Sequence, residues 1–494
     1  MTKKLNILYA SSEVEPFAKT GGLADVAGSL PREIKKLGAD IRIILPHYGF
    51  IDEQTHKITE VPSSEFEVTL GEQIVKGSLK QASLDLNGKQ VPVHFIHNDN
   101  FYNRGGIYVN PITNSDYPDN GERFIFFSRA ILQVLKKLGW KPDIIHCNDW
   151  QTGLIPLYLK HTYKDDEFYK DIETIFTIHN LAYQGLFDKD LMSIAGISWD
   201  VFTIDGIEFY DRMNFMKAGI VYSDYVTTVS PKYAEEICSS VEYGYGLEGV
   251  LVYRKSKLIG ILNGADYGIW SPLKDELIPQ KYSARNIAKK AINKKALVEK
   301  FNLPFNENIP VIGMISRLAN QKGFDLIEAA ADELMKFDMQ MIFLGAGDYK
   351  YQNLLERMRK NYPPKVGVHI GFSNELAHLI EAGSDIFLMP SKYEPCGLNQ
   401  IYSLKYGTVP IVRAIGGLED SVEHYNTETK SGTGFKFFDY DHSSLTDAVR
   451  FALEVYRDKP AWIQLMKNGM KQDFSWKASA KKYIALYRKV LRVN

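Results

Sequence analysis

The chain has 494 residues, more than one hydrophobic core usually supports, and we therefore expect two or three domains. Its 59 Lys and Arg residues balance 60 Asp and Glu residues, so no global charge favours nucleic acid or an anionic membrane as a partner. The 3 cysteines are widely spaced and odd in number, which argues against a disulfide framework or a zinc site and favours a reducing, cytoplasmic compartment. No apolar run is long enough to predict a membrane span, and the N-terminal stretch predicts a first strand instead of a secretory segment.

Short apolar segments alternate with amphipathic ones over most of the chain, a pattern that predicts strands alternating with helices in parallel α/β sheets. The strands expected in the first half are residues 5–10, 41–45, 91–96, 143–146, 174–178 and 225–229. Those expected in the second half are residues 309–315, 339–344, 366–370, 385–389 and 409–412. We therefore expect two separate sheets. Within the first half, residues 65–84 alternate polar and apolar side chains, which predicts a hairpin inserted between the strands at 41–45 and 91–96.

The domain boundary is expected near residues 261–266, where a strand-like run ends in turn residues. This divides the chain into a Rossmann-like domain at 1–262 and a second one at 263–474. The last helix, at about 475–494, has no partner that the residue pattern alone selects. No low-complexity linker marks the boundary, so we expect a short hinge and two domains that face each other across a ligand-binding cleft.

A similar glycine phrase occurs near each end of the chain, as Gly21-Gly22 and as Gly416-Gly417. Each follows an apolar run and precedes a predicted helix. Glycine leaves the backbone N–H groups at a helix N-terminus open to an anion. The repetition therefore suggests two nucleotide-fold domains that face one phosphorylated ligand. Lys19 adds a positive charge before the first turn, although ordinary solvent exposure also explains a lysine there.

Two segments of the second half place charged residues between a strand and a helix. Arg317 and Lys322 are five residues apart and can clamp a diphosphate, or form a solvated pair on an exposed loop. Glu394 is placed to hold sugar hydroxyls or to stabilise a developing cation, or else it is an acidic residue at a helix start. Cys396 has no neighbour that would make it a thiolate, so we expect a packing residue able to contact phosphate or sugar.

In the first half, polar residues end two predicted strands, in the phrases His146-Cys147-Asn148-Asp149-Trp150 and Thr177-Ile178-His179-Asn180. Strand ends of parallel sheets point toward the ligand site, so Asp149 and His179 are candidates for contacting the reacting group. A histidine that is simply hydrogen-bonded within the fold is the alternative for His179.

Two further motifs match functional patterns but are explained by local structure alone. The glycines of residues 244–249 match a dinucleotide fingerprint, but they follow a helical stretch and not a first strand, which argues against an NAD site. Asp439 and Asp441 have the spacing of metal-dependent glycosyltransferases, yet an aspartate that caps the helix beginning near Ser443 explains them without a metal. We expect no metal and no cofactor.

Taken together, these motifs resemble bacterial glycogen synthases, the ADP-glucose-dependent family related to plant starch synthases. The resemblance runs through residues 19–23, 146–150, 177–180, 243–249, 263–266, 316–323 and 394–398. It implies the GT-B fold, an α/β architecture of two Rossmann-like domains around a deep cleft, with the final helix returning to the N-terminal domain. It also implies a retaining transfer of glucose from ADP-glucose to the non-reducing 4-hydroxyl of an α-1,4-glucan.

The resemblance also implies roles for individual residues. It places the diphosphate between Arg317 and Lys322 of one domain and Lys19 and Gly22 of the other. Glu394 would hold the transferred glucose. The other residues expected at the catalytic centre are His179, at the anomeric carbon, and Asp149, on the sugar side. The remaining substrate contacts expected are Gly21, Asp25, Tyr102, Asn180, Asn263, Phe372 (stacked on adenine), Cys396, Gly397, Leu398, Gly416 and Gly417.

Three positions depart from the wider pattern. Asn148 stands where the family more often has histidine, and Ile415 stands where many relatives have threonine before the second glycine pair. Tyr402, eight residues after Glu394, replaces the second glutamate of many other GT-B enzymes, as is typical of glycogen synthases. The alternatives that remain open are a retaining GT-B transferase that uses UDP-glucose, an inactive glucan-binding protein, and a covalent route through Glu394 or Asp149 instead of a front-face displacement.

Overall fold

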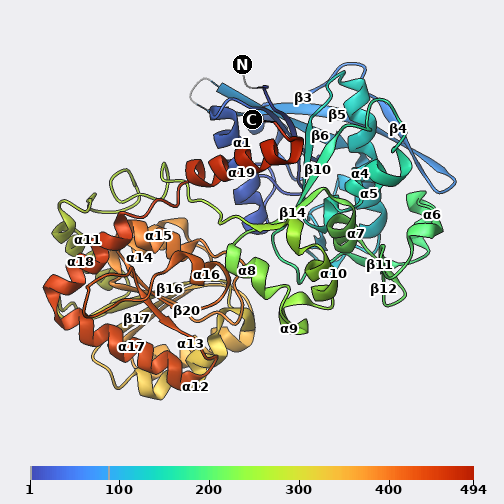
Figure 1. The fold of residues 1–494 in the computed structure, drawn as a ribbon. Coiled ribbons are helices and arrows are strands. Elements are labelled where there is room, and N and C mark those ends of the chain that lie inside the picture. The colour runs from blue at the N-terminus through green and yellow to red at the C-terminus, as the bar shows by residue number, and fades with distance from the viewer. Residues whose placement is uncertain (1–2, 87–88, 494) are drawn as a thin grey trace. The chain divides into compact units, whose positions relative to one another are not determined.

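The computed structural model describes residues 3–86 and 89–493, which form two compact units (Figure 1). Unit 1 comprises the described residues of Met1–Val229, Ala234–Ile261 and Trp476–Asn494. Unit 2 comprises Ser230–Tyr233 and Leu262–Ser475. Each unit has its own sheet, so each is described by itself.

The main sheet of unit 1 is parallel over most of its width and antiparallel at one edge. Its hydrogen-bonded order is β15-β14-β10-β9-β1-β2-β6-β5-β3, with β4 paired to β5. The strands are β1 (Asn6–Ala10), β2 (Asp40–Pro46), β3 (Thr59–Glu60), β4 (Phe66–Leu70), β5 (Gln73–Leu86), β6 (Lys89–His97), β9 (Ile144–Asn148), β10 (Glu173–Ile178), β14 (Tyr225–Thr228) and β15 (Leu258–Gly260). The predicted hairpin exists as β4–β5, but it is not a separate insertion, because β5 also pairs with β6 and continues the main sheet.

The helices of unit 1 are mostly short, apart from three that cover the sheet. The long ones are α1 (Gly22–Lys36), α4 (Asn120–Lys137) and α19 (Trp476–Leu491). The others in this part of the chain are α2 (Glu53–His56), α3 (Asp99–Tyr102), α5 (Leu154–Leu157), α6 (Leu191–Ala195), α7 (Phe215–Tyr222), α8 (Pro231–Glu236), α9 (Val241–Gly244) and α10 (Glu248–Tyr253). Short strands pair as β7 (Val109–Asn110) with β8 (Ser115–Asp116), and as β11 (Leu186–Asp188) and β12 (Glu208–Phe209) with β13 (Arg212–Asn214).

Helix α19 comes from the far end of the chain and packs on α1 of unit 1. Figure 1 shows the red α19 beside the blue α1. Its buried face includes Trp476, Tyr483 and Tyr487, while its lysines and arginines lie on the opposite side. The amphipathic pattern therefore creates an apolar face, and tertiary contacts supply the partner that covers it.

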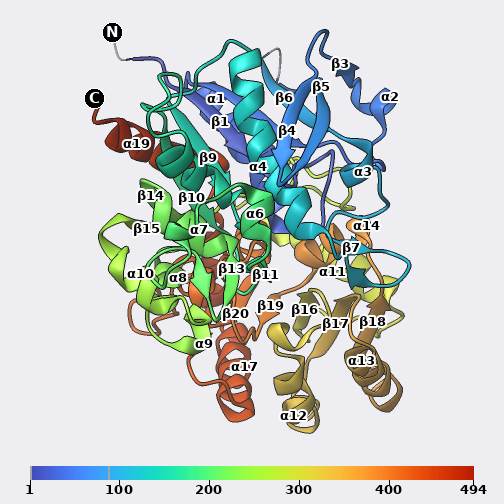
Figure 2. The same cartoon turned by 90° about the vertical axis from the view of Figure 1, so that its right-hand side faces the viewer.

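Unit 2 is built on a fully parallel six-stranded sheet (Figure 2). Its order is β18-β17-β16-β19-β20-β21. From the central strand β16 the chain first adds β17 and β18 toward one edge, and it then returns to the centre to add β19, β20 and β21 toward the other edge. The strands are β16 (Val311–Ile315), β17 (Gln340–Gly345), β18 (Val366–Ile370), β19 (Ile386–Met389), β20 (Val409–Arg413) and β21 (Phe435–Phe437). The five predicted strands are present, and β21 was not predicted. The order reverses between β16 and β19, where ligands bind in such sheets.

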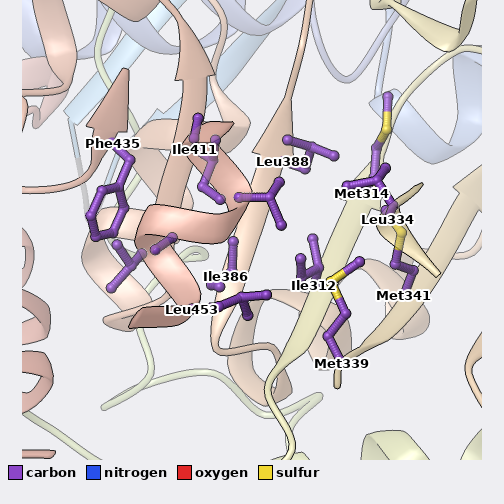
Figure 3. Packing of buried hydrophobic residues seen from close by; sticks show 14 of the residues in the cluster. Ile312, Met314, Leu334, Met339, Met341, Ile386, Leu388, Ile411, Phe435 and Leu453 are labelled. Carbon is purple, nitrogen blue, oxygen red and sulfur yellow. The ribbon is translucent and has the colours of Figure 1, made fainter. Parts of the chain in front are cut away.

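Helices surround this sheet, and the sheet's apolar side chains form the core (Figure 3). The helices are α11 (Lys290–Lys300), α12 (Phe324–Leu334), α13 (Tyr349–Asn361), α14 (Asn374–Gly383), α15 (Asn399–Tyr406), α16 (Gly416–Ser421), α17 (His442–Arg457) and α18 (Lys459–Met470). Ile312, Ile386 and Ile411 come from adjacent strands and pack with Leu334 of α12 and Leu453 of α17. Strands buried on both faces need such continuous apolar runs, which is why they were predictable.

The structural interpretations of Asp441 and of the glycines at residues 244–249 are confirmed. Asp441 caps α17, since its side chain accepts the N–H of Ser444 at 2.9 Å. The glycines of residues 244–249 lie at the end of α9 and in α10, so they do not follow a strand.

Among the residues that the structure describes, no group of 3 or more His, Cys, Asp or Glu could hold a metal ion. In the same part of the chain, no helix has the length and hydropathy of a membrane span.

Candidate active site

The candidate residues of unit 1 follow three neighbouring strands. Strands β1, β9 and β10 are adjacent and parallel, and β1 is followed by Glu13, β9 by Asp149 and β10 by His179. Because carboxyl ends of parallel strands meet at one edge, these side chains share one edge of the sheet. Glu13 was not singled out from the sequence, although a carboxylate shortly after a first strand is the signal that would have found it.

Asp149 and His179 follow adjacent strands and are joined by a hydrogen bond. The Asp149 carboxylate accepts the backbone N–H of His179 at 2.7 Å. Asp149 itself has a left-handed backbone, with φ of 54°. Burial raises the pKa of Asp149 to about 7, against the lowering effect of the N–H groups of His179 and Asn180. Asp149 thus holds the strand end that carries His179.

The imidazole of His179 is held in a neutral form. Its Nε2 lies 2.9 Å from the Oδ1 of Asn148. Burial lowers the pKa of His179 to about 3, so the ring is uncharged at neutral pH. The neighbouring His146 is fully buried, with Nδ1 2.8 Å from the Tyr487 hydroxyl and Nε2 2.6 Å from the Thr177 hydroxyl. His146 is therefore a structural residue that ties α19 to the sheet.

Asn180 has a local role in the structure. Its Oδ1 accepts the N–H of Ala182 at 3.1 Å, which stabilises the turn after β10. Its backbone N–H contributes to the Asp149 carboxylate. Any contact of Asn180 with substrate remains a prediction.

The first glycine turn already contains a carboxylate. Glu13 is 3% exposed, and its Oε2 accepts the N–H groups of Thr20 at 2.5 Å and of Gly21 at 3.1 Å. Its Oε1 accepts the hydroxyls of Thr20 at 2.7 Å and of Tyr108 at 2.8 Å. The expected anion at the Gly21 amide is therefore an internal side chain. A Cβ added at Gly21 or Gly22 would meet nothing within 4 Å, so the turn stays open to close approach.

Lys19 lies beside this turn in an exposed ion pair. Its Nζ is 2.6 Å from Asp25 and 3.8 Å from Glu15, and its side chain is 46% exposed. Ion pairs as exposed as this one are weak, so an incoming anion can compete for the ammonium group. Asp25, expected among the substrate contacts, is in this structure the partner of Lys19.

Tyr102 was wrongly assigned as a substrate contact. It is fully buried, and its hydroxyl donates to the carbonyl of Arg123 at 2.9 Å. Burial raises the pKa of this hydroxyl far above its usual range. Tyr102 packs at the end of α3 against Tyr48 and Phe126, so it belongs to the core.

In unit 2, Lys322 and Glu394 form a largely buried ion pair. The Lys322 Nζ lies 2.6 Å from the Glu394 Oε2, and the two side chains are 17% and 8% exposed. Ser391 donates to the same oxygen at 3.1 Å. The loops that carry them follow the adjacent strands β16 and β19. They approach so closely that a Cβ on Gly323 would lie 2.1 Å from the Pro390 carbonyl oxygen. Glycine there is what allows the ion pair to form.

The two alternatives for these charged residues do not hold for Lys322 and Glu394. Lys322 is not a solvated lysine, because Glu394 pairs with it. Glu394 is not a helix-start residue, because α15 begins only at Asn399. Arg317 differs because it is exposed. Its one side-chain hydrogen bond among the described residues is long, 3.5 Å from a guanidinium nitrogen to the Gln321 Oε1. Its guanidinium is therefore accessible to a ligand.

The second glycine pair packs tightly against the loop that carries Glu394. A Cβ on Gly416 would lie 2.0 Å from the Glu394 carbonyl oxygen, and one on Gly417 would lie 2.0 Å from that of Cys396. The Gly417 N–H donates to the carbonyls of Glu394 at 3.1 Å and Pro395 at 3.2 Å. The expectation of an open anion-binding amide at Gly417 is therefore wrong, because neighbouring backbone occupies it.

Asn263 contacts Cys396, which lies on this loop two residues after Glu394. Burial raises the pKa of Cys396 to about 12, so it is a neutral thiol, as expected for a packing residue. Asn263 is 6% exposed, and its Oδ1 has no hydrogen-bond partner among the described residues. A buried acceptor without a partner calls for a ligand or water. Gly397, with φ of 70°, and Leu398 lead from this loop into α15.

Phe372 follows strand β18 and is 85% exposed. The alternative of a core aromatic is therefore wrong. The ring is accessible for stacking on a planar group. Its neighbour Gly371 has φ of 140°, a conformation that glycine adopts without strain.

Comparisons with known proteins match both halves of the chain. Residues 6–253 match the family model "Starch synthase catalytic domain", and residues 297–468 match "Glycosyl transferases group 1". The chain is 47% identical over 490 residues to a glycogen synthase of Koribacter versatilis, and 46% identical over 489 residues to one of Thermotoga petrophila. In both alignments 99% of each protein is covered. The chain belongs to the glycogen synthase family.

Solved structures place this glycogen synthase family member among GT-B enzymes. It is similar to the catalytic domain of starch synthase IV from Arabidopsis thaliana bound to ADP and acarbose, with a TM-score of 0.88, 32% identity, and 99% of this chain and 100% of the other covered. A sucrose-phosphate synthase from Thermosynechococcus elongatus shares the fold, with a TM-score of 0.59 and 16% identity. The predicted GT-B fold and glucosyltransferase activity are confirmed.

Proposed function

We propose that this chain transfers glucose from ADP-glucose to the non-reducing 4-hydroxyl of an α-1,4-glucan, with retention of configuration and release of ADP. Unit 2 would hold the nucleotide sugar, and unit 1 would receive the glucan. The curated relatives are named glycogen synthase, and the Arabidopsis starch synthase was solved with ADP and acarbose. The three free cysteines fit a reducing cytoplasm, which we propose as its location.

The observation that carries this proposal is the ion pair between Lys322 and Glu394. It places a cation suited to a diphosphate 2.6 Å from a carboxylate suited to sugar hydroxyls. A diphosphate and the sugar attached to it are the reacting part of a nucleotide sugar. Arg317 on the same loop offers a second, exposed cation, and the unpartnered Oδ1 of Asn263 offers an acceptor for a hydroxyl. Phe372 is the proposed adenine contact.

For the reaction we propose a front-face displacement in which the leaving diphosphate takes the proton of the acceptor hydroxyl. Negative charge grows on the diphosphate as the glycosidic bond breaks, so Arg317 and Lys322 bind the transition state more tightly than the substrate. These cations take the role that a metal has in other transferases. His179 does not act as the acid, because burial lowers its pKa to about 3 and the N–H of a neutral imidazole is too weak an acid at neutral pH.

The proposal makes a covalent intermediate on Asp149 unfavourable. One oxygen of this carboxylate accepts the His179 N–H, and its raised pKa leaves it partly protonated near pH 7. Glu394 is engaged by Lys322 and Ser391. A trapped glucosyl-enzyme on either carboxylate would overturn the front-face mechanism.

Incorporation of radiolabelled glucose from ADP-glucose into glycogen tests the function, with UDP-glucose as competitor. We expect transfer from ADP-glucose and little competition from UDP-glucose. Preferred transfer from UDP-glucose would instead support another retaining transferase, and no transfer from either donor would support a glucan-binding protein.

The cationic clamp is tested separately with Arg317→Ala and Lys322→Ala. Each should lower kcat roughly a hundredfold, on the order of 3 kcal/mol in the barrier. Lys392→Ala, an exposed lysine on the loop after β19, is the matched control and should keep near-normal turnover. Near-normal turnover in both clamp variants would rule out the clamp.

A further inference from the structure

The side chain of Asn148, the last residue of β9, has an orientation that its surroundings determine. Asn148 is fully buried, and its Nδ2 donates to the carbonyls of Ala10 at 2.9 Å and His146 at 3.3 Å. A carbonyl oxygen can only accept a hydrogen bond. The NH₂ group must therefore face these two carbonyls, and the amide oxygen must face the opposite way.

The amide oxygen of Asn148 faces two further groups. It lies 3.0 Å from the Tyr9 hydroxyl, which donates to it, and 2.9 Å from the Nε2 of His179. An amide oxygen carries no hydrogen, so the His179 Nε2 must be the donor. A neutral imidazole has one N–H and one bare nitrogen. The Nδ1 of His179 is therefore the bare nitrogen, able to accept a hydrogen bond.

We propose that Asn148 is a positioning residue that fixes His179 as the Nε2–H tautomer and so presents the Nδ1 to a hydroxyl group of the transferred sugar. The identity of that sugar rests on the proposed function. The tautomer does not. Burial of His179 lowers its pKa to about 3 and supports the neutral ring that this arrangement requires.

An asparagine suits this place better than a histidine would. Two carbonyls, of Ala10 and His146, need donors, while Tyr9 and His179 need an acceptor. An amide supplies two N–H donors and one oxygen with two lone pairs. A neutral imidazole supplies one donor and one acceptor only. Asn148 thus satisfies all four neighbours at once, whereas a histidine would leave some of them unpaired.

The tautomer can be measured directly on the full chain labelled with ¹⁵N-histidine. The chemical shifts of the two ring nitrogens distinguish Nε2–H, Nδ1–H and the doubly protonated ring. His179→Gln identifies the signals by their loss. We expect the wild type to show only the Nε2–H form of His179 near neutral pH. A proton on Nδ1 in the wild type would overturn the proposal whether or not any variant folds.

Variants then separate positioning from simple packing. Asn148→Leu removes the acceptor and should release the tautomer, with kcat about tenfold lower. Asn148→Asp, protonated at this buried position, keeps a carbonyl oxygen toward His179 and an O–H toward the Ala10 carbonyl, so it should keep the Nε2–H form and recover activity relative to Asn148→Leu. Tyr9→Phe is the matched control: it removes the other hydrogen bond to Asn148 and should leave the tautomer unchanged. An unchanged tautomer in folded Asn148→Leu would contradict the proposal.

The two proposals fail in distinguishable ways. Absence of glucosyl transfer by the wild type would remove the proposed function and leave the tautomer result in place. Transfer by a wild type with His179 protonated on Nδ1 would remove only the role of Asn148.

Discussion

The two glycine turns share a phrase in the sequence and differ in what they do. At Gly21 and Gly22 an added Cβ would meet nothing within 4 Å, whereas at Gly416 and Gly417 it would lie 2.0 Å from a backbone oxygen. The first turn is open in space and has its Gly21 amide satisfied by the Glu13 carboxylate. The second is closed by the loop that carries Glu394. Glycine thus leaves room for another group to approach the first turn, whereas in the second turn it allows the protein's own backbone to pack closely.

The charged residues beside the two turns differ in the same way. Lys19 is 46% exposed and pairs with Asp25, which is 34% exposed. Lys322 is 17% exposed and pairs with Glu394, which is 8% exposed. A pair removed from water interacts more strongly, and breaking it leaves an uncompensated charge. The unit 2 turn is therefore part of a rigid site, while the unit 1 turn carries a cation that can change partners.

The largest difference between the two turns is expected in the free energy of unfolding when a glycine of each is replaced by alanine. Gly417→Ala places a methyl group on the Cys396 carbonyl and should lower the free energy of unfolding by about 3 kcal/mol. Gly22→Ala meets no atom and should change it by about 0.5 kcal/mol or less. Urea denaturation measures both. Equal losses in the two variants would show that the turns are not packed differently.

The ion pairs should respond unequally to loss of their cations. Lys322→Met leaves Glu394 buried without its partner and should destabilise the protein by about 2 kcal/mol. Lys19→Met, the matched control, should cost less than about 0.5 kcal/mol because its pair is exposed. Thermal unfolding of both variants at the same salt concentration tests this. If Lys19→Met were the more destabilising, the assignment of rigid and adaptable sites would be reversed.

Glu13 should prove to be a structural anion of the first turn. Glu13→Gln keeps the shape and the capacity to hydrogen-bond, but it replaces charge-assisted bonds to Thr20 and Gly21 with neutral ones. We expect a loss of about 1 kcal/mol in the free energy of unfolding. Glu15→Gln, an exposed glutamate two residues later, is the control and should have little effect. No loss in Glu13→Gln would mean that the carboxylate does not stabilise the turn.

Stability should also depend on pH through the carboxyl group of Asp149. Its pKa is about 7 in the folded protein and 3.8 without the fold, so the folded state binds more protons between these values. Stability therefore falls as the pH rises from about 4 to about 7 and does not change further above that window. Asp149→Asn removes this contribution, so the variant should gain stability relative to the wild type across the window.

Urea denaturation at a series of pH values measures that difference. Asp165→Asn, which removes an exposed carboxylate of the same unit, controls for the change in net charge. Parallel stability curves for the wild type and Asp149→Asn would contradict the raised pKa of Asp149.

Much of the fold was predictable because it depends on local patterns. Apolar runs placed all five predicted strands of unit 2, and an aspartate before a helix predicted the cap at Asp441. The antiparallel pairing of β5 with β6 was missed, because strand alternation says which faces are apolar and not which strand lies alongside.

The candidate site was predictable in its residue types and less so in their surroundings. Tyr102 and Phe372 are both aromatic residues near strand ends, yet one is fully buried and the other is 85% exposed. Asn148 was visible only as a departure from a motif, and its hydrogen bonds to Ala10 and His179 come from segments far away in the chain. Such contacts leave no local signal.

The sequence by itself determined the fold class, the family, and the residues Lys322, Glu394 and His179 that carry the proposed chemistry. The fold class follows from the alternation of predicted strands and helices, whereas the family and the roles of these residues follow from the resemblance of the motifs to that family. Only the tertiary structure decided which glycine turn is open and which is packed, that a carboxylate of the chain itself occupies the first, and which nitrogen of His179 carries the proton. The physical reason is that local sequence sets backbone preferences, whereas filling a turn or satisfying a buried polar atom depends on groups that folding brings from elsewhere.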